Sequence, residues 1–450
     1  MTHGATVVAY AAAAILAWFA YASRKPAEVP NVRLTPATEI KERTPEDLQA
    51  AEDLQVAQAQ YEEHQKRERE SLDEFRRTSP YRQTRTISVD TSSGKILGFC
   101  TLGEGRLALL TGAASPYGAA RAKEDDAVES RLVWLAADGH EERAVPLDFV
   151  PRSVTAGPDG SLWVAGDASI AHLSTTGEIL ATAESPHFTL EPEGQEEFLA
   201  EAKARQEMQV VRCTEGIQRL AEMIEELEKK QEGEPGFQPQ EVVARLKEDL
   251  QSGKQSIEEL KSMPDEQIME DELVRLRQIH RIAATTDNVF LVAQQPTGYG
   301  YSVWRCGSDL SSPVRIVEGL SGCCGQMDIQ VVDGGLAIAE NSRHHVRMVD
   351  IEGEEIRTFG ERSEADITKG FGGCCNPMNT CLDNTGCLLT SESNGLVKRY
   401  SLDGQMQEVI GVADVESGCK NSSIGLSADG ASLYYLDIHK GTIVVLEKAG

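Results

Sequence analysis

Two pairs of adjacent cysteines occupy matching positions of an internal repeat, and their thiols are the most reactive groups that the pattern offers. The first pair lies in Ser-Gly-Cys-Cys-Gly-Gln-Met-Asp (321–328) and the second in Gly-Gly-Cys-Cys-Asn-Pro-Met-Asn (372–379). A third copy, Ser-Gly-Cys-Lys-Asn-Ser-Ser-Ile (417–424), keeps only the first cysteine. From Cys323 to Cys374 is 51 residues, and from there to Cys419 is 45. These spacings are typical of the blades of a β-propeller.

Three kinds of chemistry are open to these cysteines. Disulfides between neighbouring blades, for example from Cys323 or Cys324 to Cys374 or Cys375, would stabilise the fold by roughly 2–4 kcal/mol each. A disulfide within one adjacent pair would be strained and easily reduced, which is typical of a redox-active site. Thiolates also bind Zn²⁺ or Cu(I), but adjacent residues are poor chelators of one ion. Cys419 is a further candidate for a disulfide or for redox activity.

Four polar residues and one methionine follow the cysteine pairs and are candidates for the rim of a binding face. They are Gln326 and Asp328 after the first pair, and Asn376, Met378 and Asn379 after the second. No Ser-His-acid arrangement, phosphate loop or dinucleotide fingerprint stands out, so no catalytic residue and no cofactor are predicted. A metal ion on the four paired cysteines is the one cofactor that the sequence keeps open.

Acidic residues end the second strand of several predicted blades, at Asp167, Glu340, Glu392 and Asp437. They could form an acidic ring that binds a cation or a sugar. The favoured interpretation is structural, because a carboxylate at a strand end accepts backbone N–H bonds and fixes the neighbouring turn.

Short alternating strands separated by glycine-rich turns run through residues 84–186 and 279–450 and predict four-stranded blades. Three strands at the C-terminus (424–428, 432–437 and 442–448) lack a fourth. The isolated strand 85–90 at the front would supply it and close the ring. The predicted fold is therefore an all-β, six-bladed propeller.

The stretch Asn341-Ser-Arg-His-His-Val-Arg-Met-Val-Asp-Ile-Glu-Gly-Glu-Glu-Ile-Arg-Thr-Phe-Gly360 resembles an NHL repeat. In that family an acid ends the second strand, an Asn-x-Arg sequence leads into the third, and Phe-Gly closes the blade. Residues 392–400 resemble it too, whereas the other blades depart from the pattern. The resemblance implies the propeller fold. NHL-like propellers bind proteins, RNA or small ligands, and a few are enzymes, so the resemblance does not choose a function.

The N-terminal region predicts export. Residues 5–22 form an apolar run without charge, about long enough to span a bilayer. Residues 1–25 are therefore expected to be a transmembrane anchor or, if cleaved, a signal peptide, with the rest facing the periplasm or the cell exterior. Ten cysteines agree with an oxidising compartment. Residues 26–83 predict a proline-containing linker followed by an exposed helical stalk.

Residues 187–278 interrupt the propeller and predict helices. Apolar residues at 3,4 spacing from Val210 to Leu227 and from Val243 to Leu260 flank a Gly/Pro-rich break, which is typical of an antiparallel coiled-coil hairpin. Gly253 interrupts the second seam. Residues 265–279 could add a third helix.

The formal charge of −28, from 72 acidic and 44 basic residues, argues against nucleic-acid binding. In the expected topology the cysteine loops and the helical insertion project from one rim, and the stalk joins at the other. An anchored chain would then point the cysteine rim away from the membrane. The sequence thus favours a membrane-anchored, extracytoplasmic scaffold that binds a protein partner through the rim and the hairpin. The alternative is a redox-active or metal-dependent enzyme that uses the paired cysteines.

Overall fold

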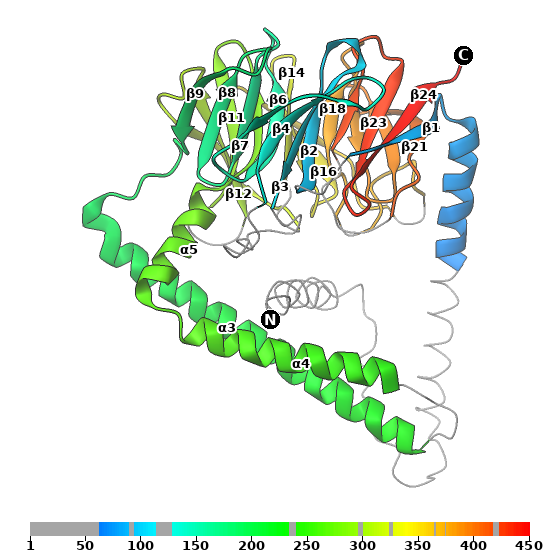
Figure 1. Ribbon diagram of the computed structural model, residues 1–450. Helices are drawn as coiled ribbons and strands as arrows, with labels where there is room; N and C mark the ends of the chain where they lie inside the picture. The colour runs from blue at the N-terminus through cyan, green and yellow to red at the C-terminus, as the bar shows by residue number, and fades with distance from the viewer. Residues whose placement is uncertain are drawn as a thin grey trace. The chain divides into compact units, whose positions relative to one another are not determined.

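The computed structural model describes residues 63–89, 94–113, 128–233, 240–295, 300–323, 327–363, 366–373, 375–416 and 423–450. Two compact units divide the chain: residues 66–189 and 273–450 form one, and the other contains residues 190–272. The first unit is all-β apart from the helix 63–78 and the end of α5 (Asp265–Arg277), and the second is helical (Figure 1).

The β unit consists of six four-stranded antiparallel sheets, as expected for a six-bladed propeller. In five of them the strands follow each other in chain order from the inner to the outer edge. These five sheets are β2 (Lys95–Thr101), β3 (Leu107–Gly112), β4 (Arg131–Leu135) and β5 (Glu141–Pro146); β6 (Pro151–Ala156), β7 (Leu162–Gly166), β8 (Ser169–Leu173) and β9 (Ile179–Glu184); β10 (Ile279–Ala284), β11 (Asn288–Gln294), β12 (Tyr301–Gly307) and β13 (Val314–Leu320); β14 (Asp328–Val332), β15 (Gly335–Glu340), β16 (His345–Asp350) and β17 (Glu355–Phe359); β18 (Thr380–Leu382), β19 (Leu388–Ser391), β20 (Leu396–Tyr400) and β21 (Met406–Val412).

The sixth sheet joins the two ends of the propeller. It contains β22 (Ile424–Leu426), β23 (Ser432–Asp437), β24 (Thr442–Lys448) and, beside β24, the first strand β1 (Tyr81–Ser88). The register runs from Tyr81 opposite Lys448 to Ser88 opposite Thr442. The predicted closure is confirmed, although β1 begins at Tyr81 rather than near residue 84. Pairing the two ends covers a strand edge that either end alone would expose.

Hydrophobic side chains fill every junction between neighbouring sheets, and this explains why the blades form a closed ring. One cluster joins the first and second sheets around Leu110 and Val164, and the cluster that closes the ring joins the sixth and first sheets around Leu109 and Val445. The remaining four junctions have clusters of the same kind. Alternation along each strand supplies one apolar face to each neighbour.

Glycine is required where these strands approach each other most closely. A Cβ atom at Gly166 would lie 1.9 Å from the carbonyl oxygen of Val150, and one at Gly335 would lie 1.9 Å from that of Val349. Both distances are far below a van der Waals contact, so a side chain at either position would push the strands apart.

The insertion folds into α3 (Gln195–Gly233), α4 (Gln240–Lys261) and the first part of α5. Leu220, Ile224 and Val243 form a small buried core between α3 and α4. Gly253 permits close packing rather than breaking it, because a Cβ atom there would lie 2.2 Å from Cδ1 of Ile217. The helices begin at Gln195, later than the expected boundary at residue 187.

The helix 63–78 lies against the β unit instead of forming an exposed stalk. Leu72 is buried with Leu396, Val409 and Val412 of the fifth sheet. The Asn394 side chain, in the turn from β19 to β20, donates a hydrogen bond to Glu68 at 2.9 Å. Figure 1 shows this helix in blue beside β21.

The helix 63–78 runs from one face of the β unit toward the other. In an antiparallel blade, the β19–β20 turn lies on the same face as the loops that lead into the innermost strands, which carry the cysteine pairs. Glu68 therefore lies toward that face, and the chain runs from there to the start of β1. The expected anchor at residues 5–22 lies outside the described residues, and no helix within the described part is long and apolar enough to cross a membrane.

Candidate functional site

The paired cysteines belong to two loops that lead from an outermost strand to the next innermost strand. The first runs from β13 to β14 (residues 321–327) and the second from β17 to β18 (residues 360–379). Together with the β15–β16 and β19–β20 turns, these loops make up what we call the cysteine face. Cys324, Cys374, Cys419 and Gln326 lie outside the described residues.

Most of the residues predicted to form the rim are buried rather than exposed on the cysteine face. Asp328, Asn376, Met378 and Asn379 are between 2% and 7% exposed, and Cys375 is 1% exposed. Cys323 is half-buried, and its backbone N–H donates to Oδ1 of Asn341 at 2.8 Å. The exposed atoms of the face therefore come from other residues.

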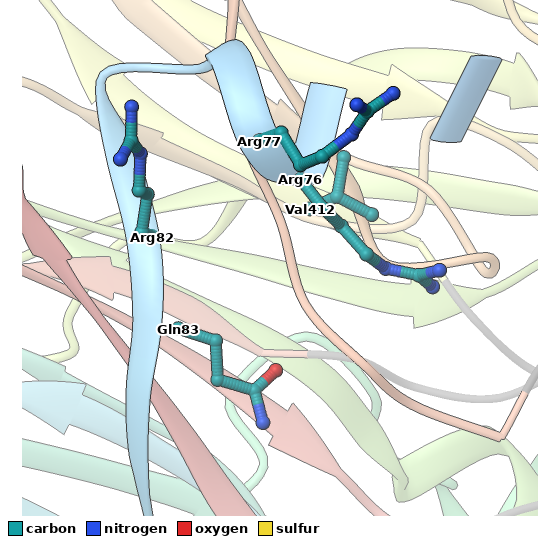
Figure 2. Close-up of a pocket in the computed structure, with 5 residues that line it drawn as sticks. All are labelled: Arg76, Arg77, Arg82, Gln83 and Val412. Atoms are coloured by element: carbon teal, nitrogen blue, oxygen red, sulfur yellow. The ribbon is translucent and has the colours of Figure 1, made fainter. Parts of the chain in front are cut away.

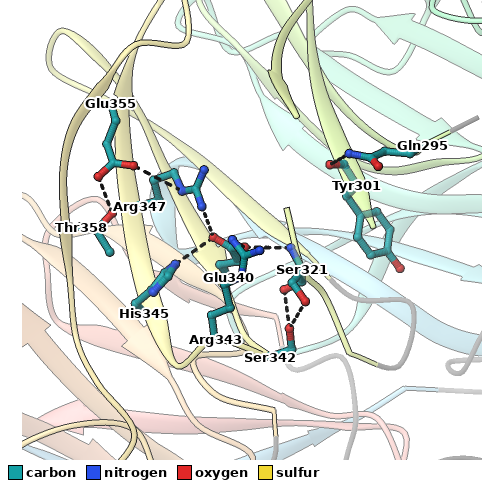
Figure 3. A network of polar contacts seen from close by, with 10 residues as sticks. All are labelled: Gln295, Tyr301, Ser321, Glu340, Ser342, Arg343, His345, Arg347, Glu355 and Thr358. Carbon is teal, nitrogen blue, oxygen red and sulfur yellow. Dashed lines mark hydrogen bonds and ion pairs between the residues drawn. The ribbon is translucent and has the colours of Figure 1, made fainter. Parts of the chain in front are cut away.

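Glu340, the last residue of β15, fixes the start of the first cysteine loop through a hydrogen bond (Figure 3). Its fully buried carboxylate accepts the backbone N–H of Ser321 at 2.8 Å and a bond from Nε2 of His345 at 2.8 Å. Arg343 and Arg347 form ion pairs with it at 2.6 and 2.9 Å. Burial disfavours the charge, but these bonds and cations outweigh it and hold the pKa of Glu340 below its ordinary value.

Glu392 holds the second cysteine loop in the same way. It follows β19, is fully buried, and accepts the backbone N–H of Gly372 at 3.2 Å. Its partner is Lys398, also fully buried, whose ammonium group forms an ion pair with Glu392 and donates to the carbonyl of Gly370. The same ammonium lies 5.1 Å from the ring centre of Phe371. Burial raises the pKa of Glu392, and the charge of Lys398 opposes that effect.

A third carboxylate repeats the arrangement at the end of β23. Asp437 accepts the backbone N–H of Glu416, in the loop before β22, at 3.1 Å. The structural interpretation of these acids is thus confirmed for three blades. In the second blade Asp167 differs, because it pairs with Arg152 at 2.5 Å and accepts a bond from Gln278 at 2.8 Å. The carboxylates of all four acids are therefore bonded to other groups of the protein, and three of them fix loops.

Asp328 connects three consecutive blades at their innermost strands. Its carboxylate forms a 3.0 Å ion pair with Arg281 of β10 and accepts bonds from the N–H and hydroxyl of Thr380 of β18, at 2.6 and 2.9 Å. Arg281 and Asp328 are both buried. No sequence pattern indicates this contact, since its members are about 50 residues apart.

No two of the seven described cysteines form a disulfide with each other. Burial raises the pKa of Cys100 to about 12 and that of Cys306 to about 11, and it raises that of Cys381 still further. Within the described ranges, no group of three or more His, Cys, Asp or Glu side chains is arranged to hold a metal ion. These three thiols thus have the properties of packing residues.

We expect Cys306 and Cys381 to resist alkylation in the folded protein at pH 8, because only the thiolate reacts and burial suppresses it. Cys387 is half-buried and should be alkylated before these two. Iodoacetamide labelling followed by peptide mass spectrometry measures this order. Rapid labelling of Cys306 at the rate of Cys387 would contradict the assignment of Cys306 as a packing residue.

The two ends of the insertion are tied together within the β unit. After β9, Ser185 donates to the carbonyl of Arg277 at 2.5 Å, and Nε2 of His187 bonds the carbonyl of Leu276 at 2.8 Å. His187 is buried, 5.9 Å from Trp304 between ring centres. Burial lowers the pKa of His187 to about 4.

Acid is expected to weaken this connection. The pKa of His187 is about 4 in the folded protein against 6.5 ordinarily, so its contribution to stability is complete above pH 6.5 and is lost as pH falls toward 4. The loss should reach about 3 kcal/mol. His187→Gln keeps a donor but cannot titrate, so the fall in unfolding free energy between pH 7 and 4.5 should be smaller in this variant. Equal slopes for His187→Gln and the unmodified protein would refute the assignment.

The six four-stranded sheets define the class of protein, a β-propeller, and the chain is similar to solved structures of other proteins. The WD40 β-propeller domain of Doa1 matches with 8% identity and a TM-score of 0.39, over 82% of this chain and 98% of that one. Regucalcin from Agrobacterium tumefaciens, a calcium-binding protein, matches with 9% identity and a TM-score of 0.41, over 82% and 96%. Streptogramin B lyase matches with 11% identity and a TM-score of 0.39, over 81% and 97%. No family model and no curated protein matches the chain. These likenesses concern the fold, and they assign neither a family nor an activity.

Proposed function

We propose that the protein is a binding scaffold whose cysteine face and helical insertion contact a protein partner. The observation that carries the proposal is the use of buried carboxylates to fix the loops of one face. Glu340 and Glu392 are fully buried and bonded to those loops at Ser321 and Gly372, which fixes these parts of the loops before any partner arrives. A preformed surface loses little conformational entropy on binding.

The insertion supplies the second contact surface. A coiled-coil hairpin is part of the proposal, supported by the apolar core around Leu220, Ile224 and Val243. On its outer side α3 exposes Met208 and Val211, which are 47% and 56% accessible. Large apolar side chains on a helix surface suit contact with another protein.

The proposed family relationship is to the NHL repeats. In the fourth blade, Asn341 follows the buried acid and binds the N–H of Cys323. In the fifth blade, Oδ1 of Asn394 accepts the N–H of Leu396 at 3.2 Å. These contacts give the acid and asparagine of the repeat pattern a structural role, which supports the relationship.

Export and anchoring by residues 5–22 belong to the same proposal, as do disulfides of the rim cysteines. The apolar run supports the anchor, and the three undescribed cysteines of the rim leave such pairing open. Fractionation with and without carbonate extraction tests the anchor. Release of the intact chain into the soluble fraction would contradict it.

Photo-crosslinking in the full-length chain tests the scaffold proposal. A photoreactive amino acid replaces Arg343 on the cysteine face, Met208 on α3 or, as a control, Asp138 in the exposed turn between β4 and β5. We expect the same discrete adduct from the first two positions and none from the third. Adducts of equal yield from all three, or from none, would contradict a specific contact surface.

The alternative, a redox-active or metal-dependent enzyme, predicts a different result. Thiols are counted in the denatured full chain with and without reductant, and the metal content of the native chain is measured. A stoichiometric metal, or one pair reduced far more readily than the rest, would favour the enzyme. Fully oxidised rim cysteines that resist mild reductant, with no metal, would favour the scaffold.

A further inference from the structure

A hollow lined by arginines lies at the outer edge of the β unit. It has a volume of about 370 Å³ and is bounded by Arg76, Arg77, Arg82, Gln83 and Val412. These residues come from the end of the helix 63–78, the start of β1 and the end of β21 (Figure 2). Three guanidinium groups around one hollow are unexpected in a chain whose formal charge is −28.

The sequence concentrates positive charge here. Between Phe75 and Arg85 there are four arginines and no acidic residue. Arg85 is already used, because it donates to the carbonyl of Ala137 at 2.7 Å. The other three line the hollow. At physiological ionic strength charges act over about 8 Å, so the local positive potential persists despite the acidic chain around it.

The protein leaves much of the donor capacity of these arginines unused. Arg82 is exposed and forms no hydrogen bond or ion pair within the described part of the chain. Arg77 is exposed and uses only Nε, which donates to the carbonyl of Asp73 at 3.2 Å. Arg76 pairs with the carboxylate of Asp73 at 2.7 Å, while its own buried Nε has no acceptor among the described residues.

Three acids face the hollow's arginines from the surrounding elements. Asp73 lies one helical turn before Arg76 and Arg77, and Asp414, after β21, is 3.9 Å from Arg76. Glu447 of β24 lies opposite Arg82 in the β1–β24 register but forms no ion pair with it. Among the described residues these carboxylates therefore engage Arg76 and leave the guanidinium groups of Arg77 and Arg82 without an ion pair.

We propose that this hollow binds an acidic peptide segment of a protein partner, with Arg77 and Arg82 pairing to separate carboxylates. Figure 2 shows the guanidinium groups of these two residues on different sides of the hollow, pointing in different directions, so one small anion would not satisfy both. Side-chain carboxylates spaced along a peptide would, and each guanidinium can bind a carboxylate through two parallel hydrogen bonds. Val412 gives the floor an apolar patch for the peptide backbone or an intervening side chain.

The test uses the full chain and a fluorescent peptide of alternating Glu and Gly, with a peptide of alternating Gln and Gly as the uncharged control. Fluorescence anisotropy should show binding of the Glu peptide only, weakened by added salt. Arg77→Gln/Arg82→Gln should weaken it by about tenfold or more, since two charge-assisted contacts are lost. Glutamine is chosen because Arg82 lies opposite Glu447 in the β1–β24 register, where an added acid would be repelled. Arg143→Gln, which removes an exposed arginine from β5, should not change the affinity.

Other outcomes would overturn the proposal. Equal affinity of the double variant would show that the peptide binds elsewhere. If inorganic phosphate displaced the fluorescent peptide at the same concentration as unlabelled Glu peptide does, the hollow would be assigned to small oxyanions. Binding of phosphatidylglycerol vesicles that the double variant abolishes, without binding of the Glu peptide, would assign it to a lipid surface. The unfolding midpoint of the double variant should match that of the unmodified chain, and loss of binding with a lowered midpoint would remove the support. None of these results depends on the cysteine face.

Discussion

Replacing Lys398 by methionine is expected to lower the free energy of unfolding by about 3–5 kcal/mol, because it leaves the charge of Glu392 buried without its partner. Both side chains are fully buried, and the ammonium of Lys398 also binds the carbonyl of Gly370 and lies over the ring of Phe371. The variant therefore loses one ion pair, one hydrogen bond and one cation–π contact together. Chemical denaturation followed by tryptophan fluorescence measures the change.

Two control variants separate the effect of breaking the buried ion pair from the effect of removing a lysine charge. Lys369→Met removes a lysine from the second cysteine loop, but this residue is largely exposed and its ion pair with Asp366 spans 3.5 Å, so the loss should stay within about 1 kcal/mol. Lys398→Met/Glu392→Leu removes both charges and should recover part of the stability that Lys398→Met loses. A single variant as stable as the unmodified protein would show that the pair is not buried in solution.

Replacing Asp328 by alanine should have an effect of similar size, about 3–5 kcal/mol, because it removes the carboxylate that forms the ion pair with the buried Arg281. Burial already lowers the pKa of Arg281, and the charge of Asp328 is what opposes that effect. The same change removes the acceptor for the N–H and hydroxyl of Thr380. Since Asp328 connects three blades, we expect the β unit of the variant to unfold in one cooperative transition with a lower midpoint.

Asp333→Ala, in the exposed turn between β14 and β15, is the matched control and should change stability by less than about 0.5 kcal/mol. Asp328→Asn keeps an acceptor for Thr380 but no charge, so it should fall between the two. A loss for Asp328→Ala no larger than that for Asp333→Ala would mean that the inner strands are held together by apolar packing alone.

The ring of blades could be predicted from the sequence because local signals determine it. Strands such as His345–Asp350 alternate polar and apolar residues over most of their length and end at glycine-containing turns, and the copies recur at blade spacing. The three strands at the C-terminus lack a fourth, and the isolated strand at the front of the propeller is its natural partner, which the pairing of β1 with β24 confirms. The repeat itself lies within about 50 residues of chain, so each copy can be recognised locally.

The contacts that fix the cysteine face could be predicted only in part. The acids at the strand ends are identifiable because they recur, but their acceptor role depends on loops of irregular backbone. Lys398 carries a signal of a different kind, because it lies in the middle of a predicted strand, two residues after Leu396 and therefore on the same side of the sheet. A lysine on that side requires a buried partner. The pair of Arg281 and Asp328 carries no such signal, because it joins strands of different blades.

The surface on which the helix 63–78 packs could not be predicted from the sequence either. Its charge pattern indicates an exposed helix, and only Leu72 and Phe75 reveal the side that packs on the fifth sheet. Two apolar residues in two helical turns are too few to predict which surface they cover. The structure supplies that surface.

The central claim is that buried carboxylates hold the loops of the cysteine face in place, and amide hydrogen exchange tests it directly. The backbone N–H groups of Ser321, Gly372 and Glu416 each donate to such a carboxylate. They should exchange roughly a hundredfold or more slowly than in an unstructured peptide, although they lie in loops. Glu340→Ala should accelerate exchange at Ser321 and leave Gly372 slow. Rapid exchange at all three positions in the unmodified protein would contradict a preformed face.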